Sequence, residues 1–231
     1  MAFIMYSTPS WLTAFSTGKE SGVEALGLRL KDLALPRQVH SDNVCWMSEA
    51  GRPEATDAVI TDKPGLCVCV KTADCIPILL YDIRKRIVAA VHAGWRGTVA
   101  RIVQKTIEQM KPESPSDIHA IIGPGISLEW FEVGDEVYEA FRAAGFPMER
   151  IAQRPSKSPS KGDFSSSLLR GGRVGSWHID LWEANKWLLE RQGVSDIYIE
   201  GTCTRASENF YSARRETINT GRNYNGIYIN L

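Results

Sequence analysis

Short apolar runs, each about the length of a β-strand, dominate the first half of the chain. Their β-branched and apolar residues predict strands buried on one or both faces. The runs are residues 57–61 (DAVIT), 66–71 (LCVCVK), 76–81 (IPILLY) and 87–92 (IVAAVH). Two further short strands are predicted at residues 37–40 and 44–47, on either side of a polar turn at residues 41–43.

The second half of the chain alternates helical patterns with short apolar strands. Apolar residues recur at helical spacing over residues 98–110 and 133–144, and a third helix is predicted over 180–192, where Asp180 can cap its start. Because strands cluster early and helices are irregularly interspersed, the pattern favours one α+β domain with mixed sheets over residues 1–231. Late strands are predicted at residues 118–122, 196–200 and 226–230.

Residues 154–176 differ in composition from the rest of the chain. They are rich in Ser, Gly, Pro and basic residues, which predicts a mobile, solvated loop. The alternative interpretation is a loop that closes over a bound substrate. Its basic side chains would suit a phosphate group.

Charge balance and cysteine usage exclude several classes of partner. The chain has 27 basic and 27 acidic residues, whereas nucleic-acid binders are usually basic, so no nucleic-acid partner is expected. No apolar run is long enough for a bilayer, and the N-terminal segment lacks the basic start of a signal peptide. Five cysteines, an odd number, are expected as free thiols in a reducing compartment. The sequence therefore predicts a cytoplasmic protein with no nucleic-acid or membrane partner, and it specifies no oligomeric state.

Three residues at predicted strand ends form the candidate reactive group. His40 precedes the turn at residues 41–43, Cys75 lies in a polar break between two strands, and His92 ends an apolar strand. Two histidines and one cysteine with an open fourth position form a known type of catalytic zinc site, which can acidify a bound water. The spacing matches no zinc-finger signature. The same residue types also suit a cysteine hydrolase in which Cys75 is the nucleophile and His92 or His40 the base.

Other candidate groups have structural interpretations. Cys67 and Cys69 lie two residues apart, on one face of a predicted strand, so a buried pair is expected rather than a metal site. His119 is expected to pack beside its strand. His178 could order the start of the following helix or reach the reactive group, and Trp95 could pack at a strand–helix junction or stack on a base.

The order of short motifs along the chain resembles one bacterial family. HAGWRG at residues 92–97, with an upstream ADC at 73–75 and an earlier QVH at 38–40, is a specific combination. On these motifs the chain resembles bacterial polyphenol oxidase, or laccase-domain, proteins, a family that is also described as purine nucleoside phosphorylases. The match covers nearly the whole chain and also includes Thr56-Asp57-Ala58, Ile122-Gly123-Pro124, Glu132-Val133-Gly134, His178-Ile179-Asp180-Leu181, Ser212-Ala213-Arg214-Arg215 and Thr220-Gly221-Arg222.

The resemblance implies a layered α/β/β/α fold with mixed β-sheets and a Zn²⁺ site formed by His40, Cys75 and His92. It also implies a purine nucleoside phosphorylase with adenosine deaminase activity. The expected substrates are adenosine and inosine, with methylthioadenosine as a further candidate, and phosphate is the expected co-substrate.

Several polar residues near these motifs are candidates for substrate binding or proton transfer. Arg37 flanks His40, and Arg96 lies just before a predicted helix N-terminus, so either could bind phosphate. Gln38 could bind a base or ribose edge. Asp74, next to Cys75, is the candidate proton shuttle or partner of a metal ligand, and its alternative is a structural turn aspartate.

A copper-dependent polyphenol oxidase is the alternative function that the resemblance raises. Laccase chemistry needs several copper ions held chiefly by imidazoles. The chain contains only four histidines, which cannot supply a blue-copper centre and a trinuclear cluster together. Copper is therefore disfavoured as the cofactor.

Overall fold

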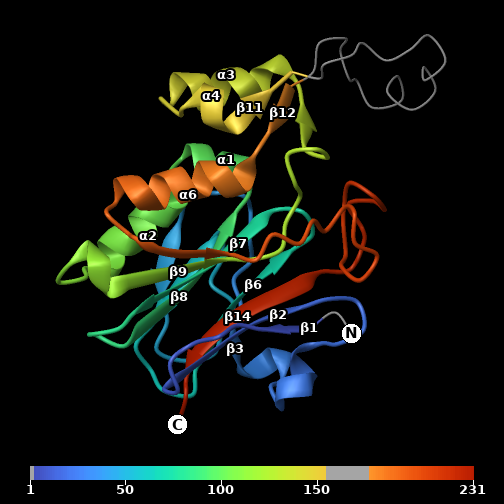
Figure 1. The fold of residues 1–231 in the computed structure, drawn as a ribbon. Coiled ribbons are helices and arrows are strands. Elements are labelled where there is room, and N and C mark those ends of the chain that lie inside the picture. Colours follow the sequence, from blue (N-terminus) through green and yellow to red (C-terminus); the bar gives the residue numbers. More distant parts are fainter. Residues whose placement is uncertain (1–2, 155–176) are drawn as a thin grey trace.

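Two β-sheets stacked face to face form the centre of the structure, and helices cover one of them (Figure 1). The computed structural model describes residues 3–154 and 177–231. The six-stranded sheet has the order β13-β9-β7-β8-β5-β4, and the five-stranded sheet has the order β1-β2-β14-β6-β3. Each sheet contains parallel and antiparallel pairs, which confirms the predicted α+β fold with mixed sheets.

Most of the predicted strands are present, with ends that differ by one or a few residues. The six-stranded sheet contains β4 (Val44–Trp46), β5 (Ala58–Thr61), β7 (Ile76–Asp82), β8 (Ile87–Ala93), β9 (Ile118–Ile122) and β13 (Asp196–Ile199). The five-stranded sheet contains β1 (Phe3–Met5), β2 (Leu12–Thr17), β3 (Leu33–Ala34), β6 (Cys67–Thr72) and β14 (Asn223–Ile229). A small third sheet contains β10 (Glu132–Val133), β11 (Ala152–Gln153) and β12 (Trp177–Ile179). The strands β1 to β3 and the small sheet were not predicted from the sequence.

Alternation of side chains along the central strands explains why both faces of the six-stranded sheet are covered. Ile78 and Leu80 of β7 pack toward the helices, whereas Leu79 between them packs into the core shared by the two sheets. In β8, Val91 packs toward the helices and Ala90 packs into the core between the two sheets. Successive strand residues point to opposite faces, so an all-apolar strand requires cover on both, as predicted for residues 87–92.

The helices are α1 (Trp95–Val99), α2 (Ile102–Met110), α3 (Asp135–Ala143), α4 (Met148–Ile151) and α6 (Leu181–Arg191). Helices α1, α2 and α6 cover the six-stranded sheet, and α3 and α4 lie with the small third sheet, beyond α1 and α6 (Figure 1). Asp180 caps α6 as predicted, because its side chain accepts a hydrogen bond of 2.9 Å from the backbone N–H of Glu183. No helix within the described residues is both long and apolar enough to span a membrane.

The outer face of the five-stranded sheet has its own small core. Phe15, Cys67 and Cys69 are fully buried there, beneath two short 3₁₀ turns at Val23–Leu26 and Leu30–Asp32. The buried cysteine pair is confirmed. The order of layers is therefore α/β/β with short helical turns as the fourth layer.

Two predicted elements, a helix and a strand, differ from the structure. A predicted loop falls largely outside the described residues. The helix expected over residues 98–110 is interrupted because Arg101 adopts a left-handed φ of 63°, which separates α1 from α2. The strand expected at residues 37–40 is absent, because the backbone N–H groups of Val39 and His40 bond to the side chain of Asp57 instead of a neighbouring strand. The loop expected at residues 154–176 lies, apart from Arg154, outside the described residues.

Candidate metal centre

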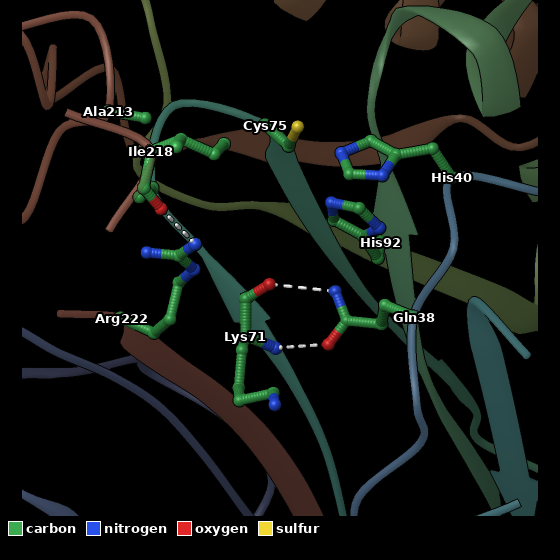
Figure 2. Close-up of a pocket in the computed structure, with 9 residues that line it drawn as sticks. Gln38, His40, Lys71, Cys75, His92, Ala213, Ile218 and Arg222 are labelled. Carbon is green, nitrogen blue, oxygen red and sulfur yellow. Dashed lines mark hydrogen bonds between the residues drawn. The ribbon is translucent and has the colours of Figure 1, made fainter. Parts of the chain in front are cut away.

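His40, Cys75 and His92 converge at one end of the six-stranded sheet. Cys75 directly precedes β7, and His92 lies near the end of the antiparallel neighbour β8, opposite Pro77. His40 approaches from the loop before β4. One ligand atom from each of the three side chains lies within 4.8 Å of the others, and Figure 2 shows the two rings and the sulfur grouped together. The sequence prediction that these residues come together is met by the geometry.

Asp57 is the residue that organises this group, and the sequence analysis did not select it as a site residue. Its carboxylate is fully buried and accepts backbone hydrogen bonds from His40 at 3.0 Å and Ser41 at 2.8 Å. The ring nitrogen Nδ1 of His92 lies 2.7 Å from Asp57 Oδ1. An ionised carboxylate only accepts hydrogen bonds, so Nδ1 of His92 carries a proton, and Nε2 is the ring nitrogen that is directed toward Cys75.

The electrostatics of the group favour a thiolate. Burial alone would raise the pKa of the Cys75 thiol, but the charge on His92 and hydrogen bonds with His40 and His92 lower it to about 6. Burial would lower the pKa of His92, whereas the Cys75 thiolate and the hydrogen bond with Asp57 raise it to about 9. A low thiol pKa is expected for a cysteine that binds a metal or acts as a nucleophile.

Backbone geometry around the group is unusual in two places. His40 has a φ of 62° and Asp74 a φ of 93°, both in the left-handed region that non-glycine residues rarely adopt. Gly94 approaches the group so closely that a Cβ atom there would lie 3.1 Å from Cys75 Sγ and 3.1 Å from a His40 ring carbon. A side chain at this position would therefore crowd Cys75 and His40, and glycine leaves them the space to converge.

The group opens into a pocket of about 240 Å³. One wall holds His40, Cys75 and His92, and Figure 2 shows Arg222 on the opposite side. The remaining lining residues are Gln38, Lys71, Ala73, Ala213 and Ile218.

Gln38 lines the pocket, but its amide is engaged by the protein. Its Nε2 donates to the carbonyl oxygen of Lys71 at 2.7 Å, and its Oε1 accepts from the Lys71 N–H at 2.8 Å. The two bonds imitate those between neighbouring strands (Figure 2). Gln38 thereby joins the segment that carries His40 to strand β6.

The side chain of Asp74 is also engaged by the protein, because both of its carboxylate oxygens accept hydrogen bonds. Thr204 Oγ1 donates to one oxygen at 2.7 Å, and the backbone N–H of Arg214 donates to the other at 2.7 Å. Asp74 is buried and does not line the pocket. It holds the segment that includes Ala213, which forms part of the pocket wall.

The two arginines proposed from the sequence lie outside the pocket lining. Arg37 pairs with Glu54 at 3.0 Å on the surface. Arg96 is exposed, and its guanidinium lies 4.4 Å from the centre of the Trp95 ring. His178 does not line the pocket either. It lies on β12 of the small sheet, and its Nδ1 is 2.9 Å from the carbonyl oxygen of Leu128. The basic residues that do line the pocket are Lys71 and Arg222. The sequence analysis did not select either as a site residue, although Thr220-Gly221-Arg222 was among the motifs that carried the family resemblance.

The arrangement could support two kinds of chemistry. Thiolate and imidazole donors with one open side could hold a metal ion, and a carboxylate behind a metal-binding histidine is the usual second layer of such sites. The same atoms also form a chain from Asp57 through His92 to Cys75, which resembles a cysteine nucleophile with its base and orienting acid. The second histidine beside the sulfur, His40, favours the metal.

Comparison with known proteins places the chain in a family. A family model described as multi-copper polyphenol oxidoreductase laccase matches residues 16–230. The purine nucleoside phosphorylase of Bacteroides thetaiotaomicron is 42% identical over 215 residues, which cover 86% of this chain and 74% of that protein. Adenosine deaminase RL5, from an unknown prokaryotic organism, is 39% identical over 218 residues, covering 88% of this chain and 77% of that protein.

A solved structure confirms the fold. YlmD from Geobacillus stearothermophilus has a TM-score of 0.81 with this chain at 25% sequence identity, and the alignment covers 96% of this chain and 93% of that one. The family model spans most of the sequence, and the two relatives are named for reactions of purine nucleosides. The chain therefore belongs to the multi-copper polyphenol oxidoreductase laccase family.

Proposed function

We propose that this protein is a zinc-dependent purine nucleoside phosphorylase that also deaminates adenosine. The observation that carries the proposal is the convergence of His40, Cys75 and His92 on one wall of a pocket. The names of the two relatives supply the substrate class. Adenosine and inosine are the substrates we expect, and methylthioadenosine is a further candidate.

The donor set fits zinc. Zinc–ligand distances of about 2.0–2.3 Å place tetrahedral ligands roughly 3.5 Å apart, and the three donor atoms already lie within 4.8 Å of one another. Zinc bound there would supply Lewis acidity and make a coordinated water more acidic. Asp57 would keep His92 in the tautomer that presents Nε2 to the ion.

The pocket residues divide between the base and the more polar parts of a nucleoside. Ala73, Ala213 and Ile218 give one part of the pocket an apolar surface suited to a purine ring. In phosphorolysis a phosphate oxygen forms a bond to the ribose C1′, the C1′–N bond breaks, and the base leaves with a proton. In deamination a water oxygen replaces the amino group at C6, and ammonia leaves. Gln38 and Asp74 act in this proposal as braces for the pocket walls rather than as groups that react.

A phosphate-dependence assay tests the proposal. Zinc-quantified protein would be incubated with adenosine or inosine, with and without phosphate, and products separated by chromatography. We expect about one zinc per chain, hypoxanthine and ribose 1-phosphate from inosine only with phosphate, and inosine from adenosine without it. Zinc-loaded protein that converts neither nucleoside would refute the proposal.

The Asp57–His92–Cys75 chain makes a cysteine hydrolase the second candidate. Chelation followed by zinc addition separates the two. A zinc enzyme loses activity on chelation and regains it with zinc, whereas a thiol enzyme survives chelation and is inactivated by an alkylating agent.

Multi-copper oxidation does not fit the described residues. Such chemistry needs several ions with chiefly imidazole ligands. Two of the four histidines lie elsewhere: His119 stacks on Tyr81 with ring centres 4.9 Å apart, and Nδ1 of His178 lies 2.9 Å from the carbonyl oxygen of Leu128. The geometry favours one ion at His40, Cys75 and His92.

Replacing Gly94 with alanine is expected to lower zinc affinity at least about tenfold. The added methyl group would lie 3.1 Å from Cys75 Sγ and from the His40 ring, so both side chains must move apart. A competition titration with a chromophoric chelator measures the change. Gly51→Ala is the matched control, because its methyl would meet only the flexible end of Met47, at 3.3 Å. Equal affinities in the two variants would show that the zinc does not lie beside Gly94.

A further inference from the structure

The pocket beside the candidate metal centre carries positive charge without an acidic counterpart. Lys71 and Arg222 line it, and no aspartate or glutamate is among its lining residues. Within residues 3–154 and 177–231, no ion pair joins either of these side chains to a carboxylate. Two cations in one partly enclosed pocket repel each other, so their placement is unfavourable unless an anion binds between them.

Strand pairing places the two residues that carry these charges close together. β6 and β14 are antiparallel neighbours in which Lys71 lies opposite Tyr224, and Arg222 precedes β14 by one residue. Lys71 and Arg222 are therefore diagonal neighbours on the same face of the sheet. Burial, and then the charges of Arg52 and Arg222, lower the pKa of Lys71.

Arg222 is held in position but retains free donors. Its Nη1 donates to the carbonyl oxygens of Thr220 and Gly221, and its Nη2 donates to that of Ile218 at 2.8 Å. A guanidinium has five N–H groups, so at least two remain for a ligand. The backbone bonds fix the direction of the guanidinium in advance, which reduces the entropy lost when an anion binds.

We propose that Lys71 and Arg222 form an oxyanion subsite that binds inorganic phosphate for attack on the nucleoside. This rests on the proposed phosphorylase function. Adenosine and inosine carry no charge at neutral pH, so phosphate is the anion that this reaction brings to the pocket. Arg222 faces the group of His40, Cys75 and His92 across the pocket (Figure 2). A nucleoside lying between the two walls would present its ribose to the bound phosphate.

The test substitutes Lys71 with methionine in the zinc-loaded protein. Methionine keeps an unbranched side chain, and the two bonds between Gln38 and Lys71 involve only the backbone of residue 71. We expect KM for phosphate in inosine phosphorolysis to rise at least about tenfold. KM for inosine and zinc content should stay within about twofold, and Lys71→Arg should restore most of the affinity. Lys63→Met is the matched control, because Lys63 pairs with Asp62 at 2.9 Å on the surface and does not line the pocket.

Two measurements distinguish failure of the subsite from failure of the proposed function. Inorganic phosphate should raise the melting temperature of the wild type and not that of Lys71→Met or Arg222→Met. Phosphorolysis with an unchanged phosphate KM in both variants would overturn the subsite and leave the function intact. Phosphate stabilisation that depends on Lys71, in a protein that splits no nucleoside, would support the subsite and overturn the function.

The phosphate group of a nucleotide is the alternative anion that Lys71 and Arg222 could bind. The wild type and Lys71→Met would be assayed on adenosine 5′-monophosphate and adenosine without added phosphate. We expect no preference for the nucleotide. A preference that disappears in Lys71→Met would show that the cations hold the phosphate of the substrate itself, and it would overturn the assignment to inorganic phosphate.

Discussion

Replacing Asp57 with alanine is expected to lower the free energy of unfolding by about 3–5 kcal/mol and zinc affinity by about 10- to 100-fold. The carboxylate is fully buried and accepts hydrogen bonds from Ser41 at 2.7 and 2.8 Å. It also holds the backbone of His40 and the ring of His92. Its removal leaves these donors without a partner in a site that water does not readily reach, which costs more than the bonds themselves contribute.

Urea denaturation of the chelator-treated wild type and variant measures the change in the free energy of unfolding without a contribution from metal binding. Asp62→Ala is the control, because Asp62 pairs with Lys63 at the surface and should change stability by less than about 1 kcal/mol. The free energy of unfolding of Asp57→Asn should lie between those of the wild type and Asp57→Ala, because the amide keeps one acceptor oxygen but loses the charge. A change below about 1 kcal/mol for Asp57→Ala would contradict the organising role of Asp57.

Replacing Cys75 with alanine is expected to abolish stoichiometric zinc binding and to reduce phosphorolysis and deamination at least about 10³-fold. The sulfur hydrogen-bonds to both histidines, and two imidazoles alone would bind zinc weakly. Metal content by mass spectrometry and product formation by chromatography are the measurements. Cys203→Ala is the matched control: Cys203 is also partly buried, but its sulfur accepts from Ser127 Oγ at 3.1 Å and it does not line the pocket.

Cys75→Asp separates the role of metal ligand from that of nucleophile. A carboxylate can bind zinc but is a much weaker nucleophile than a thiolate. Partial activity that depends on added zinc is the expected result. Full zinc occupancy with no activity, beside an active wild type that resists chelation, would assign the chemistry to the thiol.

The apolar strands and the three candidate ligands could be predicted because both leave local signals in the sequence, whereas the layered arrangement followed from the family resemblance. Strands such as residues 76–81 and 87–92 are apolar throughout, and that pattern needs cover on both faces. His40, Cys75 and His92 lie in short motifs next to turns. Their meeting point followed from the family resemblance, since their spacing alone matched no metal signature.

The residues that were missed act through contacts between distant segments. Asp57 stood within an apolar strand pattern, and only the fold shows that its carboxylate faces the backbone of residues 39–41. Lys71 lies on β6 and Arg222 directly precedes β14, and these two strands pair only in the folded sheet. Arg37 seemed suited to phosphate because of its place beside His40, but in the folded chain its guanidinium pairs with Glu54 on the surface.

The central place of β14 in the five-stranded sheet has a consequence for synthesis on the ribosome. β14 lies between β2 and β6, and its Asn225 accepts a hydrogen bond of 2.6 Å from Ser16, 209 residues earlier in the chain. Until that late segment leaves the exit tunnel, β2 and β6 expose unpaired edges that can associate with other nascent chains. Arg222 arrives with the same segment, so the emerging polypeptide can form its cluster of two histidines and a cysteine before it can complete the pocket.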